Sequence, residues 1–276
     1  MKTIYLFLIA ILVGLTACEK EIHIDIPDND SKLVVSCHLG SGKIINVDVS
    51  ASIPLYAESS GEIKNVDNAL VRISADQSNW QIIPYNVTEN RYVLPLNLLP
   101  IVEGETYYIE VSAAGYKTVN SKTTIPVYQT IYPTLVSLDT IAYDYGKEIA
   151  ARFKFSDIPN QSNYYAVKAY VKANNQWSEM DLNGSGAWVF SDRQEDGREF
   201  VINFTKYYDF VCDSLRLEVF QTNEAFYQFE YSMYLYSPDS PFSEPTPLYT
   251  NITNGLGVLS GYTTREYLFS GELFRK

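Results

Sequence analysis

Short runs that alternate apolar and polar residues, separated by turn-forming Gly, Pro, Asn and Asp, restrict the fold of this chain more than any other feature. Residues 45–50 show the period of two that is typical of a β-strand with one face in a core, and residues 106–112 are expected to form another strand after a turn at residues 103–105. About seven such runs, with turns at regular spacing, fit into residues 33–126, which is the pattern of an immunoglobulin-like β-sandwich. The sequence therefore predicts a mainly β protein whose first folded unit is this sandwich.

A second β-rich unit is expected over residues 127–276. Strand patterns resume at residues 149–156 and 214–220, whereas residues 172–187 are expected to form a loop. The glycines of residues 254–262 suggest tight turns and close approach of backbones. We expect this unit to be an antiparallel sheet or a partly closed barrel, with one helix packed on it.

Residues 224–236 have the pattern of a helix. They follow Thr222 and Asn223, which are good N-cap residues, and they end before Pro238. Because this helix is apolar on most of its sides, we expect it to be buried across the second sheet. The alternative is an exposed aromatic platform for a ligand, made of Tyr227, Tyr231 and Tyr234.

Residues 1–17 have the layout of an export signal, in which Lys2 precedes an apolar run that is shorter than a membrane span of about 20 residues. The run ends in Leu15-Thr16-Ala17-Cys18, the pattern of a bacterial lipobox. We therefore expect cleavage before Cys18 and attachment of acyl chains such as palmitate to its thiol; an ordinary secretory signal is the alternative. Residues 18–32 form a short tether, which would hold the first sandwich close to a bilayer.

The charge composition argues against two classes of binding partner, nucleic acids and anionic lipids. The chain has 21 basic and 33 acidic residues, for a formal net charge of −12. An acidic surface argues against binding to nucleic acid and against docking on anionic lipid, while it permits divalent cations. The 23 tyrosines are typical of an exported, all-β protein.

No catalytic arrangement is evident in the sequence, and we expect neither enzymatic activity nor a cofactor or metal. His23 lies in the tether, and His38 in the first strand. Cys37 is adjacent to His38, but neighbouring strand residues point to opposite faces, so the two cannot easily act together. Cys37 and Cys212 are predicted to be separate thiols rather than a disulfide.

A run of acidic residues is a second candidate for ligand binding. Asp192, Glu195 and Asp196 cluster beside Gly197 and could supply oxygen ligands to Ca²⁺. A solvated acidic turn is the favoured interpretation, because most charge runs face water.

Several segments of the chain resemble a Bacteroidota lipoprotein family catalogued as domain of unknown function 4249. The segments are Cys18-Glu19-Lys20-Glu21-Ile22, Lys32-Leu33-Val34-Val35, Glu224-Ala225-Phe226-Tyr227, Pro241-Phe242-Ser243-Glu244-Pro245, Tyr249-Thr250-Asn251-Ile252, Asn254-Gly255-Leu256-Gly257-Val258 and Gly261-Tyr262. The resemblance implies an Ig-like sandwich of the carboxypeptidase-regulatory kind, a second β-rich domain, and a location at the outer membrane, often beside a TonB-dependent transporter. It implies no established activity. Cys37-His38 departs from the family, whose members tend to carry other residues there.

These observations indicate a non-catalytic, lipid-anchored cell-envelope protein that binds a partner or ligand, as an accessory to an outer-membrane transporter. Glu19-Lys20-Glu21 resembles a charged start associated with surface export, so the cell surface is preferred over the periplasmic face. One alternative is a carboxylate-based hydrolase acting on glycans, which needs a cleft with two facing carboxylates about 5–9 Å apart. Another is a structural or adhesive surface module, which predicts flat aromatic patches and no cleft.

The lipid anchor can be tested directly. Two or three acyl chains on Cys18 would give stable membrane binding, at about 0.8 kcal/mol per buried CH₂. We expect cells fed with labelled fatty acid to label the wild-type protein, and Cys18→Ala to abolish the label. Label that persists in Cys18→Ala, or that is missing from the wild type, would contradict the lipobox.

Overall fold

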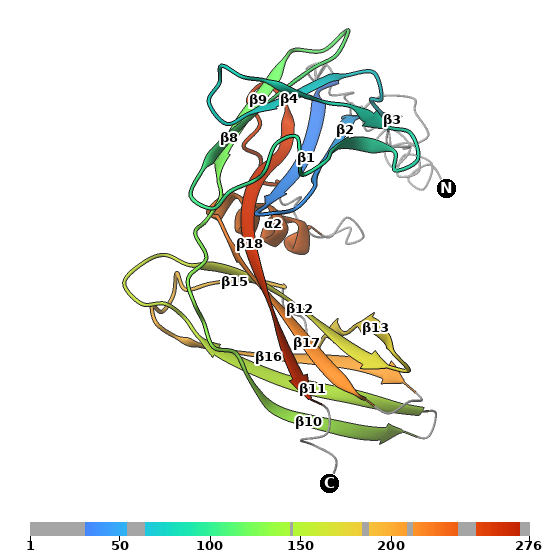
Figure 1. The fold of residues 1–276 in the computed structure, drawn as a ribbon, viewed down its shortest axis with the longest axis vertical. Helices are drawn as coiled ribbons and strands as arrows, with labels where there is room; N and C mark the ends of the chain where they lie inside the picture. Colours follow the sequence, from blue (N-terminus) through green and yellow to red (C-terminus); the bar gives the residue numbers. More distant parts are fainter. Residues whose placement is uncertain are drawn as a thin grey trace, which may run out of the picture.

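Strands in which apolar and polar residues alternate pair into three sheets. These sheets form two β-sandwiches stacked end to end (Figure 1). This computed structural model describes residues 31–53, 64–143, 146–183, 188–208, 212–236 and 247–270. The predicted signal, Cys18, almost all of the tether and the run Pro241–Pro245 lie outside the described residues. No helix in the described ranges is both long and apolar enough to cross a membrane.

The first sandwich takes its strands from the N-terminal half of the chain. One sheet has β5-β4-β8-β9 in order, and the facing sheet contains β1, β2, β7 and β6. The alternate buried residues of these strands, such as Val35, Val47, Ile73 and Ile109, form its core. The strands are β1 (Leu33–Gly40), β2 (Ile45–Ala51), β3 (Lys64–Asn65), β4 (Leu70–Ser74), β5 (Gln81–Ile83), β6 (Tyr85–Asn86), β7 (Arg91–Leu94), β8 (Thr106–Ser112) and β9 (Val119–Thr124).

The second sandwich packs the sheet β10-β11-β16-β14 against β13-β12-β17, and both sheets stay open rather than closing into a barrel. Phe153, Phe155, Tyr165 and Phe204 fill the core between them. The predicted loop over residues 172–187 is wrong, because β12 turns at Asn174 and Asn175 into two further strands. The strands are β10 (Thr134–Tyr143), β11 (Gly146–Ser156), β12 (Tyr164–Ala173), β13 (Gln176–Glu179), β14 (Asp181–Leu182), β15 (Val189–Ser191), β16 (Glu199–Tyr208) and β17 (Ser214–Thr222).

One long strand, β18 (Leu256–Ser270), belongs to both sandwiches and is drawn in red in Figure 1. Residues 256–262 pair in parallel with β1, and residues 262–270 pair antiparallel with β17. Tyr262 is the residue at which the pairing changes over, because it lies opposite both Gly40 and Thr222. The turn predicted at the glycines of the tail is confined to Asn254 and Gly255, and the residues after them form one continuous strand. The range 127–276 therefore supplies an element of the first sandwich.

Gly257 allows β18 to lie against β1. Its backbone has a φ of +102°, and a Cβ at this position would lie 2.1 Å from the carbonyl oxygen of Val35. The sequence correctly indicated close backbone approach here, but this glycine sits inside a strand rather than in a turn.

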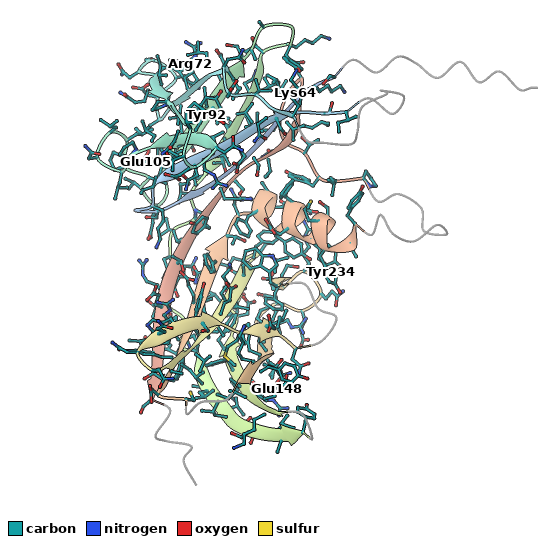
Figure 2. The ribbon with its side chains drawn as sticks, turned by 90° about the vertical axis from the view of Figure 1, so that its right-hand side faces the viewer. Lys64, Arg72, Tyr92, Glu105, Glu148 and Tyr234 are labelled. Carbon is teal, nitrogen blue, oxygen red and sulfur yellow. The ribbon has the colours of Figure 1, made fainter. Side chains whose placement is uncertain are left out.

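The single helix of the described residues, α2 (Glu224–Leu235), lies across the seam between the sandwiches (Figures 1 and 2). Asn223 caps it by accepting a hydrogen bond from the N–H of Phe226 at 3.1 Å, as its sequence predicts. The Asn223 amide also donates to Thr123 of β9, which ties the helix to the first sandwich. The expected packing on the second sheet is confirmed by contacts with β18, β15 and β12. The expected burial holds for one face only: Phe226 is buried, but Tyr231 and Tyr234 are 37% and 45% exposed.

The pairing of β18 with β1 predicts an unusually costly substitution. Gly257→Ala combines a left-handed backbone with a clash against main-chain atoms that cannot move aside, so we expect a loss of roughly 3–5 kcal/mol in the free energy of unfolding. Urea denaturation measures this loss. Gly115→Ala is the matched control, because Gly115 has a φ of +86° but nothing within 4 Å of its added Cβ. That control should lose only about 1–2 kcal/mol, and equal losses would contradict the close approach.

Candidate functional site

A pocket of about 500 Å³ lies between α2 and residues 192–198, which join β15 to β16. Its lining is aromatic and cationic rather than acidic. The lining side chains that matter for its chemistry are Phe190, Arg193, Arg198, Phe200, Tyr227 and Tyr231.

Tyrosines of α2 form one wall of this pocket. The rings of Tyr227 and Tyr231 are stacked, with centroids 5.5 Å apart and planes 11° from parallel. The ring of Tyr234 continues the row, with its centroid 6.2 Å from that of Tyr231. Figure 2 shows Tyr234 near the C-terminal end of the helix. A partly exposed row of stacked rings can cover the flat face of a ligand.

Arg193 fastens the loop to the helix. Its guanidinium forms an ion pair with Glu224 in the first turn of α2. It also lies 5.6 Å from the ring centroid of Tyr164 and 5.8 Å from that of Tyr227. These contacts satisfy Arg193 within the protein, so its role is to position the pocket wall.

Arg198 differs from Arg193 because no carboxylate of the described residues forms an ion pair with it. Its guanidinium lies 5.0 Å from the ring centroid of Phe200. Its Nε is buried without a hydrogen-bond partner, and its side chain forms no ion pair with any residue in the described ranges. Leaving a buried donor unsatisfied costs about 1–3 kcal/mol, so this arginine keeps hydrogen-bonding capacity that the described residues do not use.

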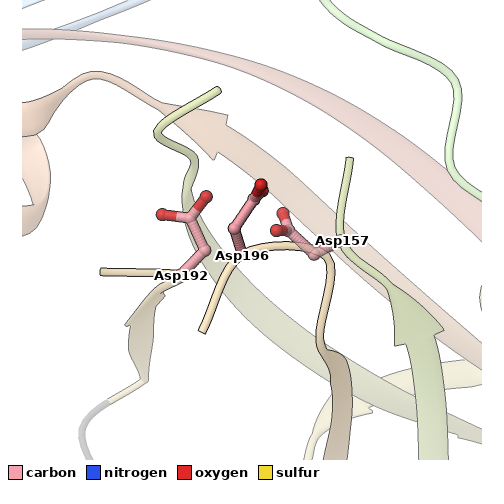
Figure 3. A group of neighbouring side chains, drawn as sticks. All are labelled: Asp157, Asp192 and Asp196. Carbon is pink, nitrogen blue, oxygen red and sulfur yellow. The ribbon is translucent and has the colours of Figure 1, made fainter. Parts of the chain in front are cut away.

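Three carboxylates meet where residues 192–198 contact the end of β11: Asp192 and Asp196 come from this loop, and Asp157 directly follows the strand. One oxygen of each of Asp157, Asp192 and Asp196 lies within 4.8 Å of the others. Figure 3 shows the Asp196 side chain between the other two. Asp157 and Asp192 are each only 5% exposed, so a solvated turn is the wrong description for Asp192, while Glu195 and Asp196 are exposed.

Neutral donors satisfy these carboxylates. Asp157 accepts from the Tyr165 hydroxyl at 2.8 Å and from the N–H of Gly197 at 3.0 Å. Asp192 accepts from the N–H of Asn163 at 3.0 Å, and Asp196 accepts from the N–H of Asn160. The cluster therefore clamps residues 192–198 to the segment 157–163. Among the described residues, this carboxylate cluster is the group whose remaining oxygen lone pairs could hold a divalent cation.

A second polar cluster lies beneath α2 at the seam. His38 Nδ1 is 2.6 Å from the Ser260 hydroxyl, and Nε2 is 3.5 Å from a carboxylate oxygen of Glu230, which also accepts from the Trp188 indole. Burial lowers the pKa of His38 to about 4 and raises that of Glu230. This Ser-His-acid arrangement was missed because it depends on the pairing of β1 with β18. Ser260 is completely buried, so its hydroxyl does not face a substrate.

Cys37 and Cys212 do not form a disulfide with each other, as predicted. Cys37 is buried in the core of the first sandwich, whereas Cys212 packs against the core of the second. Burial also raises the pKa of Cys37, so its thiol is not a ready nucleophile.

The structure thus brings four of the six candidates from the sequence to one place: Tyr227 and Tyr231 line the pocket, and Asp192 and Asp196 support its loop. Tyr234 is not among the lining residues, and Glu195 stays outside the carboxylate cluster. Nothing in the sequence pointed to Asp157, which lies 35 residues before Asp192. The sequence feature that could have pointed to Arg193 and Arg198 is their position in or next to the acidic run.

Residues 19–267 match the family described as Domain of unknown function (DUF4249), which confirms the family resemblance seen in the sequence. The match spans both sandwiches, the pocket and almost all of β18. A search of curated proteins found no match.

The carboxylate clamp can be tested by removing its buried member. Asp157→Ala would leave the buried Tyr165 hydroxyl without its acceptor, so we expect a loss of about 2–4 kcal/mol in the free energy of unfolding. Urea denaturation in EGTA measures the clamp without any cation. The control is Asp181→Ala, because that carboxylate is exposed and 3.9 Å from Lys206, and its loss should be below about 0.5 kcal/mol. Similar values for both variants would contradict the clamp.

Proposed function

The chain belongs to the family described as Domain of unknown function (DUF4249), and we propose that it is a non-catalytic, lipid-anchored protein of the cell envelope that binds a small anionic ligand in the pocket beside α2. The proposal rests on one observation above all. Arg198 is a cation with a buried, unpartnered Nε in a pocket walled by aromatic rings.

The lining defines the class of ligand. A carboxylate can take two parallel hydrogen bonds from a guanidinium, which is the geometry Arg favours. The stacked rings of Tyr227 and Tyr231 then suit a flat or apolar body attached to that carboxylate. A planar organic acid, or an acidic sugar presenting its apolar face, combines both features.

The absence of catalysis is part of the proposal. Ser260, His38 and Glu230 have the residue types of a hydrolase, but the buried Ser260 hydroxyl supports a structural role at the seam. An adhesive module would need only flat patches, so the pocket favours ligand binding over adhesion.

The anchor and the partner are proposed from the sequence. The lipobox at Cys18 and the short tether support an outer-membrane lipoprotein, with the cell surface preferred over the periplasmic face. The family resemblance supports a TonB-dependent transporter as the membrane neighbour. In this role the protein would hold its ligand close to the transporter that imports it.

The charge of Arg198 provides the test. We expect benzoate to bind the wild-type protein in saturation-transfer NMR, and neutral benzyl alcohol to bind at least about tenfold more weakly, which corresponds to 1.4 kcal/mol. Arg198→Gln should lose the preference for benzoate. Arg152→Gln is the matched control, because Arg152 is an exposed arginine of β11 bonded to Asn203.

An equal response to benzoate and benzyl alcohol, or a preference that survives Arg198→Gln, would contradict the anion site. Recovery of the protein as a lone monomer from membranes dissolved in mild detergent would count against the transporter as partner. The two parts of the proposal therefore fail separately.

A further inference from the structure

The outer face of the first sandwich carries a second, separate hollow. It has a volume of about 620 Å³ and lies over the sheet β4-β8-β9. Figure 2 labels Arg72 on this sandwich, well away from Tyr234 of the helix. The side chains that matter for its chemistry are Gln77, Trp80, Tyr108, Asn120 and Lys122. We call this hollow the Trp80 groove.

Trp80 is held in a fixed orientation. Its indole N–H donates to the carbonyl oxygen of Gln77 at 3.1 Å. The Arg72 guanidinium lies 4.8 Å from the ring centroid and is itself held by Glu110, at 2.6 Å. An aromatic ring fixed by an arginine on one side pays little entropy when a ligand covers its other side.

The turn before Trp80 is equally well ordered. The Asp76 carboxylate accepts from the backbone N–H groups of Ser78 and Asn79, at 2.8 and 2.7 Å, and from the Asn79 amide. Ser74 bonds the same carboxylate from the end of β4. These bonds preform the side of the groove that carries Trp80 and Gln77.

A segment distant in sequence forms the opposite rim. Thr253 pairs with Asn120 of β9 through backbone hydrogen bonds, and the Ser121 hydroxyl donates to the carbonyl oxygen of Asn251. Asn251 and Thr253 therefore extend the sheet beyond β9 and turn an open sheet face into a groove.

The groove offers polar groups that the protein leaves unused. The Tyr108 hydroxyl, the Asn120 and Gln77 amides and the Lys122 ammonium form no side-chain hydrogen bond or ion pair within the described ranges. Together they provide both donors and acceptors around one aromatic ring. The only carboxylate among the lining residues, Glu110, is already neutralised by Arg72.

We propose that the Trp80 groove binds a neutral glycan chain. The apolar C–H face of a pyranose packs on an indole ring, while its hydroxyls bond to amide, phenol and ammonium groups around the ring. An open and mostly polar hollow suits a chain rich in hydroxyl groups better than an apolar small molecule, which needs an enclosed apolar pocket. This site is independent of the anion pocket and lies on the other sandwich.

Affinity gel electrophoresis of the whole protein tests the proposal, with soluble starch, laminarin, yeast mannan and xyloglucan as probes. We expect at least one of these neutral glycans to retard the protein, and Trp80→Ala to weaken that retardation about tenfold or more. Trp177→Ala is the matched control, because Trp177 is a half-exposed indole on the second sandwich with an arginine, Arg216, 4.9 Å from its ring. It should migrate like the wild type.

A second variant keeps the test decisive if Trp80→Ala fails to fold. Tyr108→Phe removes only one hydroxyl and should weaken retardation by severalfold while the unfolding curve stays unchanged. Arg198→Gln should have no effect, so failure here and failure of the anion pocket are distinguishable. No retardation by any of the four glycans, or full retardation of Trp80→Ala, would overturn the proposal.

Discussion

The pairing of β18 with two different neighbours is the interaction on which the rest of this structure depends. Its first half completes the sheet of β1 and its second half completes the sheet of β17, so one run of backbone hydrogen bonds crosses from one sandwich to the other. The crossing needs Gly257, because any side chain there would collide with the backbone of Val35. The two sandwiches therefore share a strand, in addition to the segment that joins β9 to β10.

This shared strand also explains where the candidate sites lie. Helix α2 packs on β18 at the crossover, and His38, Ser260 and Glu230 join β1, β18 and the helix beneath it. The same helix presents Tyr227 and Tyr231 to the loop that carries Arg193 and Arg198. The pocket beside α2 is thus walled on one side by a helix that is tied to both sandwiches.

Local patterns predicted much of this fold, because alternation determines which face of a strand is buried. Residues 106–112 form β8 as predicted, and the helix expected at 224–236 spans 224–235 with the predicted Asn223 cap. Alternation does not specify the partner of a strand, so the parallel pairing of β1 with β18 was missed, and with it the His38 cluster. Only part of the pocket could be predicted. Its tyrosines follow from helical spacing, whereas the positions of Arg198 and of the supporting Asp157 depend on contacts between distant segments.

Calorimetry of the whole protein tests the central claim, that β18 makes one cooperative body of two sandwiches. If the strand couples them, heat unfolds the protein in a single transition, and the calorimetric enthalpy equals the van't Hoff enthalpy. Two resolved transitions, or a calorimetric enthalpy about twice the van't Hoff value, would show that the sandwiches unfold independently and would contradict the account.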